Sequence, residues 1–334
     1  MRCLSRAGDW GSTGSPNFPL LLVVAILGGA GYAPAWAAQN APEGSYRISL
    51  DVSLVVLHAT VTDQKGRLVS GLRQDDFCIH DQGALQRISV FRHEDAPVTV
   101  GLVIDHSGSM KPKLQDVVAA ADTFARASNP DDQVFVVNFN ERVSMGLPEG
   151  VVYASEPAEL ERAISAAPTR GKTALFDAIA RALDRLDNGK HDKKVLIVIS
   201  DGGDNASTHK LAQITRMAEE SDAILYAIGL FDEDDLDSNP KALRSLAEIT
   251  GGEAFFPKET DAVVGLCERI AKDIRSQYTL GYTPTPAPAA GTRRTIRVEA
   301  LAPHHGRLSV RTRSGYIAVP RGASDEEGRT GAGK

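Results

Sequence analysis

The 334-residue sequence has few cysteines and few aromatic residues, and these shortages exclude several classes of protein. Of its three cysteines, Cys3 precedes an apolar export segment described below, which leaves Cys78 and Cys267 in the remaining chain. Two cysteines make no disulfide framework: they either pair with each other, as an exported compartment permits, or remain two separate buried thiols. The aromatic content of 6% argues against a platform that stacks carbohydrate rings or nucleic-acid bases.

The sequence also lacks a strong excess of charge of either sign. Its formal net charge of -6 implies no broad basic face, and this argues against a nucleic-acid-binding protein. Basic residues cluster locally at 291–297, where we interpret them as a solvated loop and strand edge rather than as a polyanion site.

No apolar run reaches the about 20 residues that a membrane-spanning helix needs. Arg2 and Arg6 precede a shorter apolar run at residues 19–32, and Ala-Trp-Ala at 35–37 provides a small-x-small cleavage site. This order predicts a signal peptide over residues 1–38 that meets the membrane only transiently and is then removed. We expect an exported protein that ends in the periplasm, on the cell surface or in the medium.

Apolar patterning predicts an α/β domain framed by short strands. Continuous apolar runs such as residues 98–105 are typical of strands buried on both faces, and amphipathic helical segments alternate with them. This alternation predicts a doubly wound, mostly parallel sheet flanked by helices. The strands before and after it are too few to form separate cores, so we expect them to pack together as one small β module. The predicted organisation is a signal peptide (1–38), N-terminal β-strands (45–96), the α/β domain (97–277), C-terminal β-strands (278–320) and a disordered polar tail (321–334).

Gly171-Lys172-Thr173 matches the end of a phosphate-binding loop, but the rest of that loop is missing. The glycine expected five residues before Gly171 is Ala166, and Pro168 removes a backbone donor that the loop would use. The preceding segment has helical periodicity, whereas such a loop follows a buried strand. We therefore expect no nucleotide.

Oxygen-bearing side chains follow two of the predicted parallel strands. Asp105, Ser107 and Ser109 alternate after the first strand, so their side chains can project to the same side. Asp201 ends a second strand, and Thr173 lies in a loop before a helix. Ligand sites of parallel sheets lie beyond the carboxyl ends of the strands, where these five side chains can meet. Such hard oxygen donors suit Mg²⁺, Mn²⁺ or Ca²⁺.

These three segments together resemble a von Willebrand factor type A (VWFA) domain with its metal-ion-dependent adhesion site. The matching motifs are Asp105-x-Ser107-x-Ser109, Gly171-x-Thr173-x-Leu175-x-x-Ala178-Ile179 and Ser200-Asp201-Gly202. The resemblance spans about residues 97–277. It implies that Asp105, Ser107, Ser109, Thr173 and Asp201 hold the cation, directly or through water. It also implies that an acidic side chain of a partner protein binds the held cation.

The flanking segments are similar to the VWFA-related family of exported bacterial proteins. The similarity lies in residues 61–83, 229–240, 246–257, 280–284 and 313–318. Because the role of that family is poorly defined, this match implies architecture more than function.

Other polar residues near the predicted site have more ordinary interpretations. Asp204 and Asn205 either support the metal ligands from a second sphere or serve the turn in which they lie. The acidic stretch at 231–240 lacks the glycine and final glutamate of an EF-hand loop, so we interpret it as a solvated loop. His106 lies between Asp105 and Ser107, and its side chain should point away from both, which prevents a catalytic relay. A Gly-x-Ser-x-Gly elbow is also absent.

These observations predict an exported, cation-dependent protein-binding module that is not an enzyme. A first alternative is a structural or assembly component of the cell envelope in which the metal site is not essential. A metal-dependent hydrolase is a further alternative, for which no positioned general base can be named.

Overall fold

The computed structural model describes residues 54–201, 203–231 and 239–318. These residues belong to one compact unit. The predicted signal peptide, the acidic residues 232–238 and the predicted polar tail lie outside the described residues.

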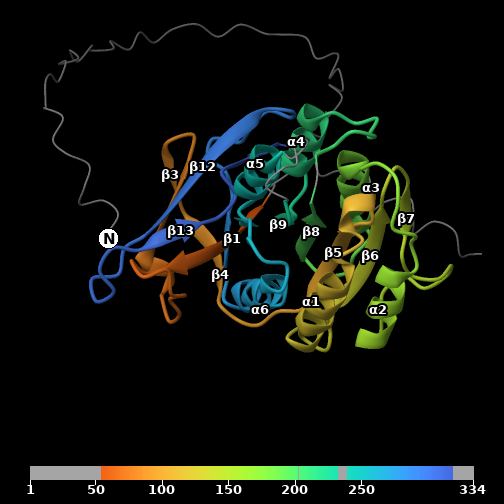
Figure 1. Cartoon of the computed structure of the whole chain (residues 1–334). Coiled ribbons are helices and arrows are strands. Elements are labelled where there is room, and N and C mark those ends of the chain that lie inside the picture. The colour runs from red at the N-terminus through yellow and green to blue at the C-terminus, as the bar shows by residue number, and fades with distance from the viewer. Residues whose placement is uncertain (1–53, 202, 232–238, 319–334) are drawn as a thin grey trace, which may run out of the picture. The chain divides into compact units, whose positions relative to one another are not determined.

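A six-stranded sheet forms the centre of the α/β domain (Figure 1). Its order is β10-β9-β8-β5-β6-β7, and every neighbouring pair except β6–β7 is parallel. The strands are β5 (Val98–Asp105), β6 (Gln133–Phe139), β7 (Val143–Met145), β8 (Lys193–Ser200), β9 (Ile224–Gly229) and β10 (Ala254–Phe255). All eight residues of β5 are buried, as the apolar run predicted. The antiparallel edge strand β7 was not predicted, since three residues carry too short a pattern.

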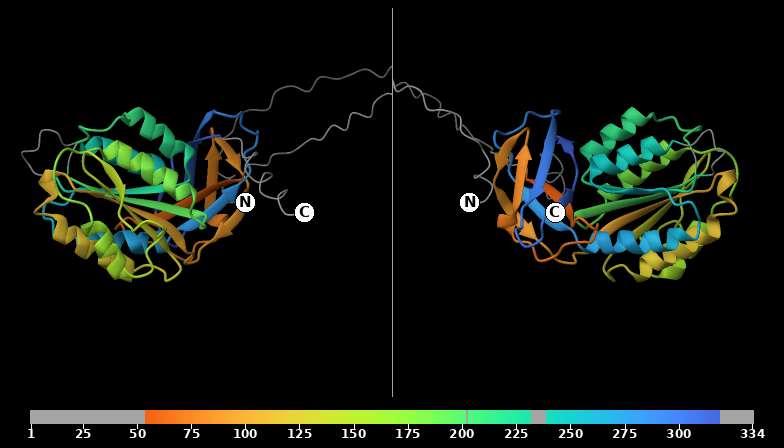
Figure 2. Two further views of the ribbon diagram at one scale, coloured as in Figure 1. Left: turned by 90° about the vertical axis from the view of Figure 1, so that its right-hand side faces the viewer. Right: turned by 60° about the vertical axis from the view of Figure 1, so that its left-hand side comes forward.

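Helices cover both faces of this sheet, which confirms the predicted fold class. Figure 2 shows helices on both faces of the sheet. One face carries α1 (Leu114–Arg126), α2 (Pro157–Ser165) and α6 (Ala262–Arg275); the other carries α3 (Leu175–Asp187), α4 (Leu211–Glu220) and α5 (Pro240–Thr250). On the first face α1 packs against α2 and α6, and on the other α4 packs against α3 and α5. Each helix buries one side of its surface against the sheet. In α3, for example, Ala178, Ala182 and Leu186 lie on the buried side. The α5 helix ends at Gly251, whose φ of 85° gives the left-handed cap that favours glycine.

The strands before and after the α/β domain form two antiparallel four-stranded sheets with their own apolar core. The first has the order β13-β1-β11-β4 and the second β14-β12-β2-β3, so each sheet mixes N- and C-terminal strands, as expected. The strands are β1 (Val55–Thr62), β2 (Phe77–Asp81), β3 (Ala84–Gln86), β4 (Ile88–Arg92), β11 (Tyr278–Tyr282), β12 (Arg293–Ala300), β13 (Ser309–Arg311) and β14 (Gly315–Ile317). The sequence pattern of residues 307–319 alone predicts one strand, but the described part of this segment is divided between β13 and β14, which lie in different sheets.

A buried polar cluster joins this β module to the α/β domain. Asp273 of α6 accepts hydrogen bonds from Thr60 Oγ1 of β1 and from the Tyr226 hydroxyl of β9, each at 2.7 Å. Arg311 of β13 forms an ion pair with the same carboxylate, and Gln277 Nε2 donates to Thr60 Oγ1 and to the Tyr226 hydroxyl. One carboxylate thus links three strands to the last helix of the domain.

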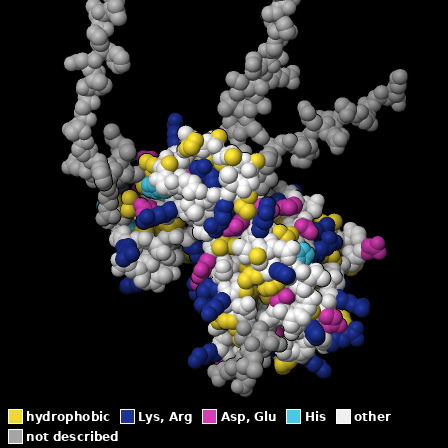
Figure 3. Space-filling view, turned by 90° about the horizontal axis from the view of Figure 1, so that it is seen from above, with side chains coloured by type: hydrophobic (Ala, Val, Ile, Leu, Met, Phe, Trp, Pro, Cys, Tyr) yellow, Lys and Arg dark blue, Asp and Glu magenta, His cyan; other side chains and the backbone are white. Residues whose placement is uncertain are grey.

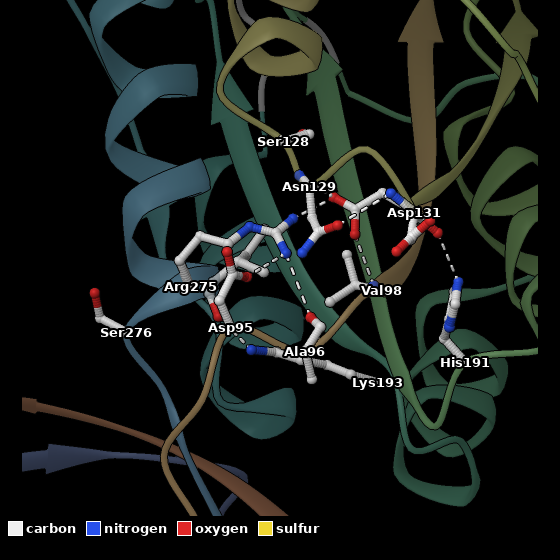
Figure 4. Close-up of polar contacts among 12 residues, drawn as sticks. Asp95, Ala96, Val98, Ser128, Asn129, Asp131, His191, Lys193, Arg275 and Ser276 are labelled. Carbon is white, nitrogen blue, oxygen red and sulfur yellow. Dashed lines mark hydrogen bonds and ion pairs between the residues drawn. The ribbon is translucent and has the colours of Figure 1, made fainter.

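Arg275 ties together the two chain segments that connect the module with the α/β domain (Figure 4). It lies at the end of α6, and its Nη1 donates to Asp95 Oδ1 at 2.8 Å and to the Ala96 carbonyl at 3.3 Å, just before β5. Its Nη2 pairs with buried Asp132, whose other oxygen accepts from the Val98 backbone N–H at 2.8 Å. Both connections therefore lie at the amino end of β5.

The cysteines do not pair with each other. Cys267 is a free, buried thiol in α6, and burial raises its pKa to about 12. Cys78 is disulfide-bonded, so the expectation of two separate thiols is wrong for this residue.

Within the described residues, no helix is long and apolar enough to cross a membrane. Figure 3 shows hydrophobic side chains in small groups among polar ones on the face that it presents.

Candidate metal centre

The predicted ligands gather where two adjacent central strands end. Asp105 is the last residue of β5, and Asp201 directly follows β8, which pairs with β5 in parallel. Because parallel strands share the position of their carboxyl ends, both carboxylates lie at one edge of the sheet. The connections to the β module lie at the amino end of β5, so this edge is at the far end of the strand.

Asp105 is fully buried and has hydrogen bonds to both carboxylate oxygens. Its Oδ1 accepts from the Ser107 backbone N–H at 2.7 Å, and its Oδ2 accepts from Ser200 Oγ at 2.6 Å. Burial, together with the negative charge of Asp201, raises the pKa of the Asp105 carboxyl to about 6. Since each carboxylate oxygen has two lone pairs, each keeps one acceptor position for a further ligand.

The two serines and Asp201 contact one another directly. Ser107 Oγ and Ser109 Oγ are 3.2 Å apart, and both hydroxyls donate to Asp201 Oδ1, at 3.4 Å and 3.0 Å. Asp201 Oδ2 accepts from Lys113 Nζ at 3.1 Å. The hydroxyl protons therefore point to Asp201, which leaves the oxygen lone pairs of the serines available.

The Thr173 loop is fastened beside the serine loop through backbone contacts. The Gly108 N–H donates to the Gly171 carbonyl at 3.3 Å. Gly171 has a φ of 78°, a left-handed conformation that favours glycine, and a Cβ at this position would displace the end of the exposed Glu141 side chain. The glycine of the Gly-Lys-Thr motif thus serves packing beside the site.

Asp204 and Asn205, predicted as second-sphere or turn residues, hold Thr173 and the start of α3. Asn205 Oδ1 accepts from the Thr173 backbone N–H at 2.9 Å, and Asp204 Oδ1 accepts from the Phe176 N–H at 3.2 Å. The Thr173 carbonyl in turn accepts from the N–H groups of Asn205 and Ala206. These residues therefore position Thr173 and the first turn of α3.

The side chains present fit a divalent cation with a preference for oxygen. Two carboxylates and the hydroxyls of Ser107 and Ser109 are hard donors, and each Asp105 oxygen keeps an acceptor position; the Thr173 loop lies beside them. Among residues 54–201, 203–231 and 239–318, no three His, Cys, Asp or Glu side chains gather closely enough to hold a metal. The candidate donor set instead combines two carboxylates with hydroxyl oxygens.

His106 is directed away from the serines, as its place between Asp105 and Ser107 predicted. Its ring is buried, and Nε2 lies 3.2 Å from Asn138 Oδ1 of β6. Burial lowers the pKa of His106, although the bond to Asn138 opposes this shift. The ring therefore supports the packing between β5 and β6.

Sequence reasoning missed two residues of this site. Ser200 bonds Asp105, and its position before Asp201 in the strand gave a signal that could have been used. Lys113 lies on the same loop as Ser109 and contacts Asp201 from a buried position. A lysine is ordinarily interpreted as a solvated residue, so its place here became visible only in the structure.

A family model described as "von Willebrand factor type A domain" matches residues 99–268, slightly more than half of the chain. No curated protein sequence matches the chain.

Three solved structures illustrate what the fold is similar to. A von Willebrand factor type A protein from Catenulispora acidiphila is 14% identical, with 74% of each chain covered and a TM-score of 0.49. The conserved hypothetical protein BatB from Bacteroides thetaiotaomicron is 16% identical over 54% of this chain and 100% of its own, with a TM-score of 0.43. Proximal thread matrix protein 1 from the mussel byssus, in a structure titled with a zinc-occupied MIDAS motif, is 19% identical. That alignment covers 58% of this chain and 49% of the mussel protein, with a TM-score of 0.45.

Proposed function

The chain belongs to the von Willebrand factor type A family, and we therefore propose that it captures an acidic group of a partner protein through a divalent cation. The observation that carries this proposal is the buried carboxylate of Asp105, which lies beside Asp201 and the two serine hydroxyls. Lys113 balances the charge of Asp201, whereas the hydrogen bonds described for Asp105 come from neutral groups, so a divalent cation would offset the cost of this buried carboxylate. We expect Mg²⁺, with Mn²⁺ and Ca²⁺ as alternatives.

Each residue has a distinct part in this proposal. Asp105, Ser107, Ser109 and Thr173 would hold the cation through their oxygens. Asp201, whose Oδ1 accepts from both serines and whose Oδ2 accepts from Lys113, would support it through water. The bound cation supplies an electrophilic centre that a carboxylate can bind with a charge-assisted bond.

Charged residues on the surrounding loops support an acidic partner. Lys111, Arg142 and Lys172 are exposed on the loops that border the site, with Glu141 among them. Lys111 lies two residues after Ser109, and Lys172 directly precedes Thr173. Such basic side chains favour the approach of an acidic segment and steer its carboxylates toward the cation.

We expect millimolar Mg²⁺ or Mn²⁺ to raise the melting temperature of the protein by several degrees. A ligand present at about 100 times its dissociation constant adds about 2.7 kcal/mol to the stability of the folded state. Asp105→Ala should abolish the metal-induced shift, whereas Asp192→Ala, an exposed aspartate just before β8, should retain it. Thermal melts across a metal titration measure this, and a wild-type melting curve that does not change would contradict the site.

Partner capture should depend on the cation. We expect pull-downs with the wild-type protein to lose the partner when EDTA is added and to regain it with Mg²⁺. Cross-linking with mass spectrometry in the native cell, with Asp105→Ala as control, would identify the partner. Equal recovery with and without EDTA would show that the adhesion mechanism is wrong.

We propose that the chain acts by binding, without catalysis, after export through a signal peptide to the periplasm, the cell surface or the medium. The ring of His106 contacts Asn138 rather than either serine, and this supports a non-catalytic role. The ion pair between Lys113 and Asp201 favours one alternative, a structural or assembly component of the envelope with a non-essential metal site. In that case the lysine balances Asp201 and the metal titration shows no effect.

A further inference from the structure

A buried lysine lies directly behind the proposed cation site. The side chain of Lys113 is 7% exposed, and its Nζ is 3.1 Å from Asp201 Oδ2, while the Asp201 side chain is 1% exposed. The same Nζ donates to the Leu230 carbonyl at 2.8 Å, at the end of β9. Lys113 therefore bridges the ends of two neighbouring strands, β8 and β9.

Backbone hydrogen bonds fix the residue from which this ammonium extends. Lys113 directly precedes α1, its own N–H donates to the Met110 carbonyl, and its carbonyl accepts from the Val117 N–H. A buried charge that is anchored in this way cannot move into solvent at low cost. It is a fixed charge of the site rather than a flexible surface residue.

This fixed charge changes the electrostatics of the donor set. The two carboxylates of Asp105 and Asp201 would fully balance a divalent cation, and an arriving carboxylate would then add an unbalanced negative charge. With Lys113 paired to Asp201, the cation-loaded site keeps one net positive charge among these groups. An ammonium close to a divalent cation also repels it.

We propose that Lys113 is a built-in positive charge that weakens cation binding and makes the loaded site select an anionic group over a neutral one. This inference rests on the proposed function and adds a residue that sets its ligand preference. Lys113 acts through Asp201 and through charge, so it is a positioning residue for the partner's acidic group. A purely structural ion pair would affect folding stability and leave cation affinity unchanged.

The test compares the wild-type chain with Lys113→Gln and Lys190→Gln. Glutamine at 113 removes the charge and retains an amide that can donate to Asp201 or to the Leu230 carbonyl. Lys190 is exposed just before β8, at the end of the sheet opposite to the site, and serves as the matched control. A second variant, Lys113→Met, covers the case in which the glutamine variant does not fold, and melting without metal verifies folding.

Two measurements are made on each protein. Calorimetric titration with Mn²⁺ gives the cation affinity, which we expect to increase on the order of tenfold or more when the charge of Lys113 is removed. Relaxation of water protons by bound Mn²⁺ then reports whether acetate, or the neutral probe acetamide, binds to the loaded protein. Acetate should bind several-fold more weakly to Lys113→Gln, with little change for acetamide, and Lys190→Gln should behave as wild type.

Each outcome of these measurements supports or overturns the inference, the proposed function or both. If the wild-type protein binds Mn²⁺ and Lys113→Gln binds it no more tightly, the inference is overturned while the proposed function stands. Tighter Mn²⁺ binding without weaker acetate binding overturns the selection of an anionic group. If only the variant binds Mn²⁺, the lysine takes the place of the cation in the wild-type chain, so the proposed function is wrong and the inference that rests on it fails as well. If neither binds, both are wrong.

Discussion

Replacing Asp273 with alanine is expected to lower the free energy of unfolding by about 2–4 kcal/mol. The change removes the acceptor of the buried Thr60 and Tyr226 hydroxyls, and it leaves Arg311, whose side chain is 27% exposed, with the more distant Glu253 carboxylate at 3.5 Å. Each buried hydroxyl left without an acceptor carries a desolvation cost of about 1–3 kcal/mol. Chemical denaturation monitored by circular dichroism measures the effect.

The matched control for this prediction is on the same helix. Glu268 is exposed and pairs with Lys272 at 2.8 Å, one helical turn away. Glu268→Ala should change the stability by about 0.5 kcal/mol or less. A loss below about 1 kcal/mol for Asp273→Ala would mean that the cluster does not couple the β module to the α/β domain.

Replacing Lys193 with methionine is expected to stabilise the protein at neutral pH and to flatten its pH dependence. Burial, together with the positive charge of Arg275, lowers the pKa of Lys193 from its usual 10.5 to about 7. Between these values the unfolded chain binds a proton that the folded chain has released. Stability therefore rises with pH through this window and is lost as the pH falls toward 7.

The measurement is the difference in unfolding free energy between Lys193→Met and the wild type from pH 6 to pH 10. We expect the variant to gain about 2–4 kcal/mol at pH 6 relative to pH 10, since each unit of pKa shift corresponds to about 1.4 kcal/mol. The neighbouring Lys194 is more exposed and pairs with Asp187, so Lys194→Met should give a nearly constant difference. A flat profile for Lys193→Met would contradict the prediction.

The central strands and the carboxylates at their ends could be predicted because their signals are local. Uninterrupted apolar residues mark β5 and β8, and Asp105 and Asp201 lie at or directly after their last residues. The topology of parallel sheets then brings the two carboxylates to one edge without further information. The pairing of N- and C-terminal strands followed from a similar argument, since neither set could bury a core alone.

Features that depend on distant partners could not be predicted. Lys113 contacts Asp201, 88 positions away, and a lysine pattern alone does not reveal such a partner. The division of residues 307–318 into β13 and β14 has the same origin. Arg313 between them is buried because it donates to Asp222 and to the Glu219 carbonyl of the α/β domain. The local sequence contains no sign of these acceptors.

The path of β5 from the module to the candidate metal centre has a mechanical consequence. The strand begins just after Asp95 and Ala96, which Arg275 contacts, and it ends at Asp105. A pull between a partner bound at the site and the β module would therefore be directed along the strand. Its neighbours β6 and β8 run parallel to it on both sides, with hydrogen-bonded register along most of the strand. Because both ends of this load lie on one strand, its covalent backbone carries the pull, while the hydrogen bonds to β6 and β8 keep the strand in place. Under the proposed function, tension from a partner would pass through the centre of the sheet.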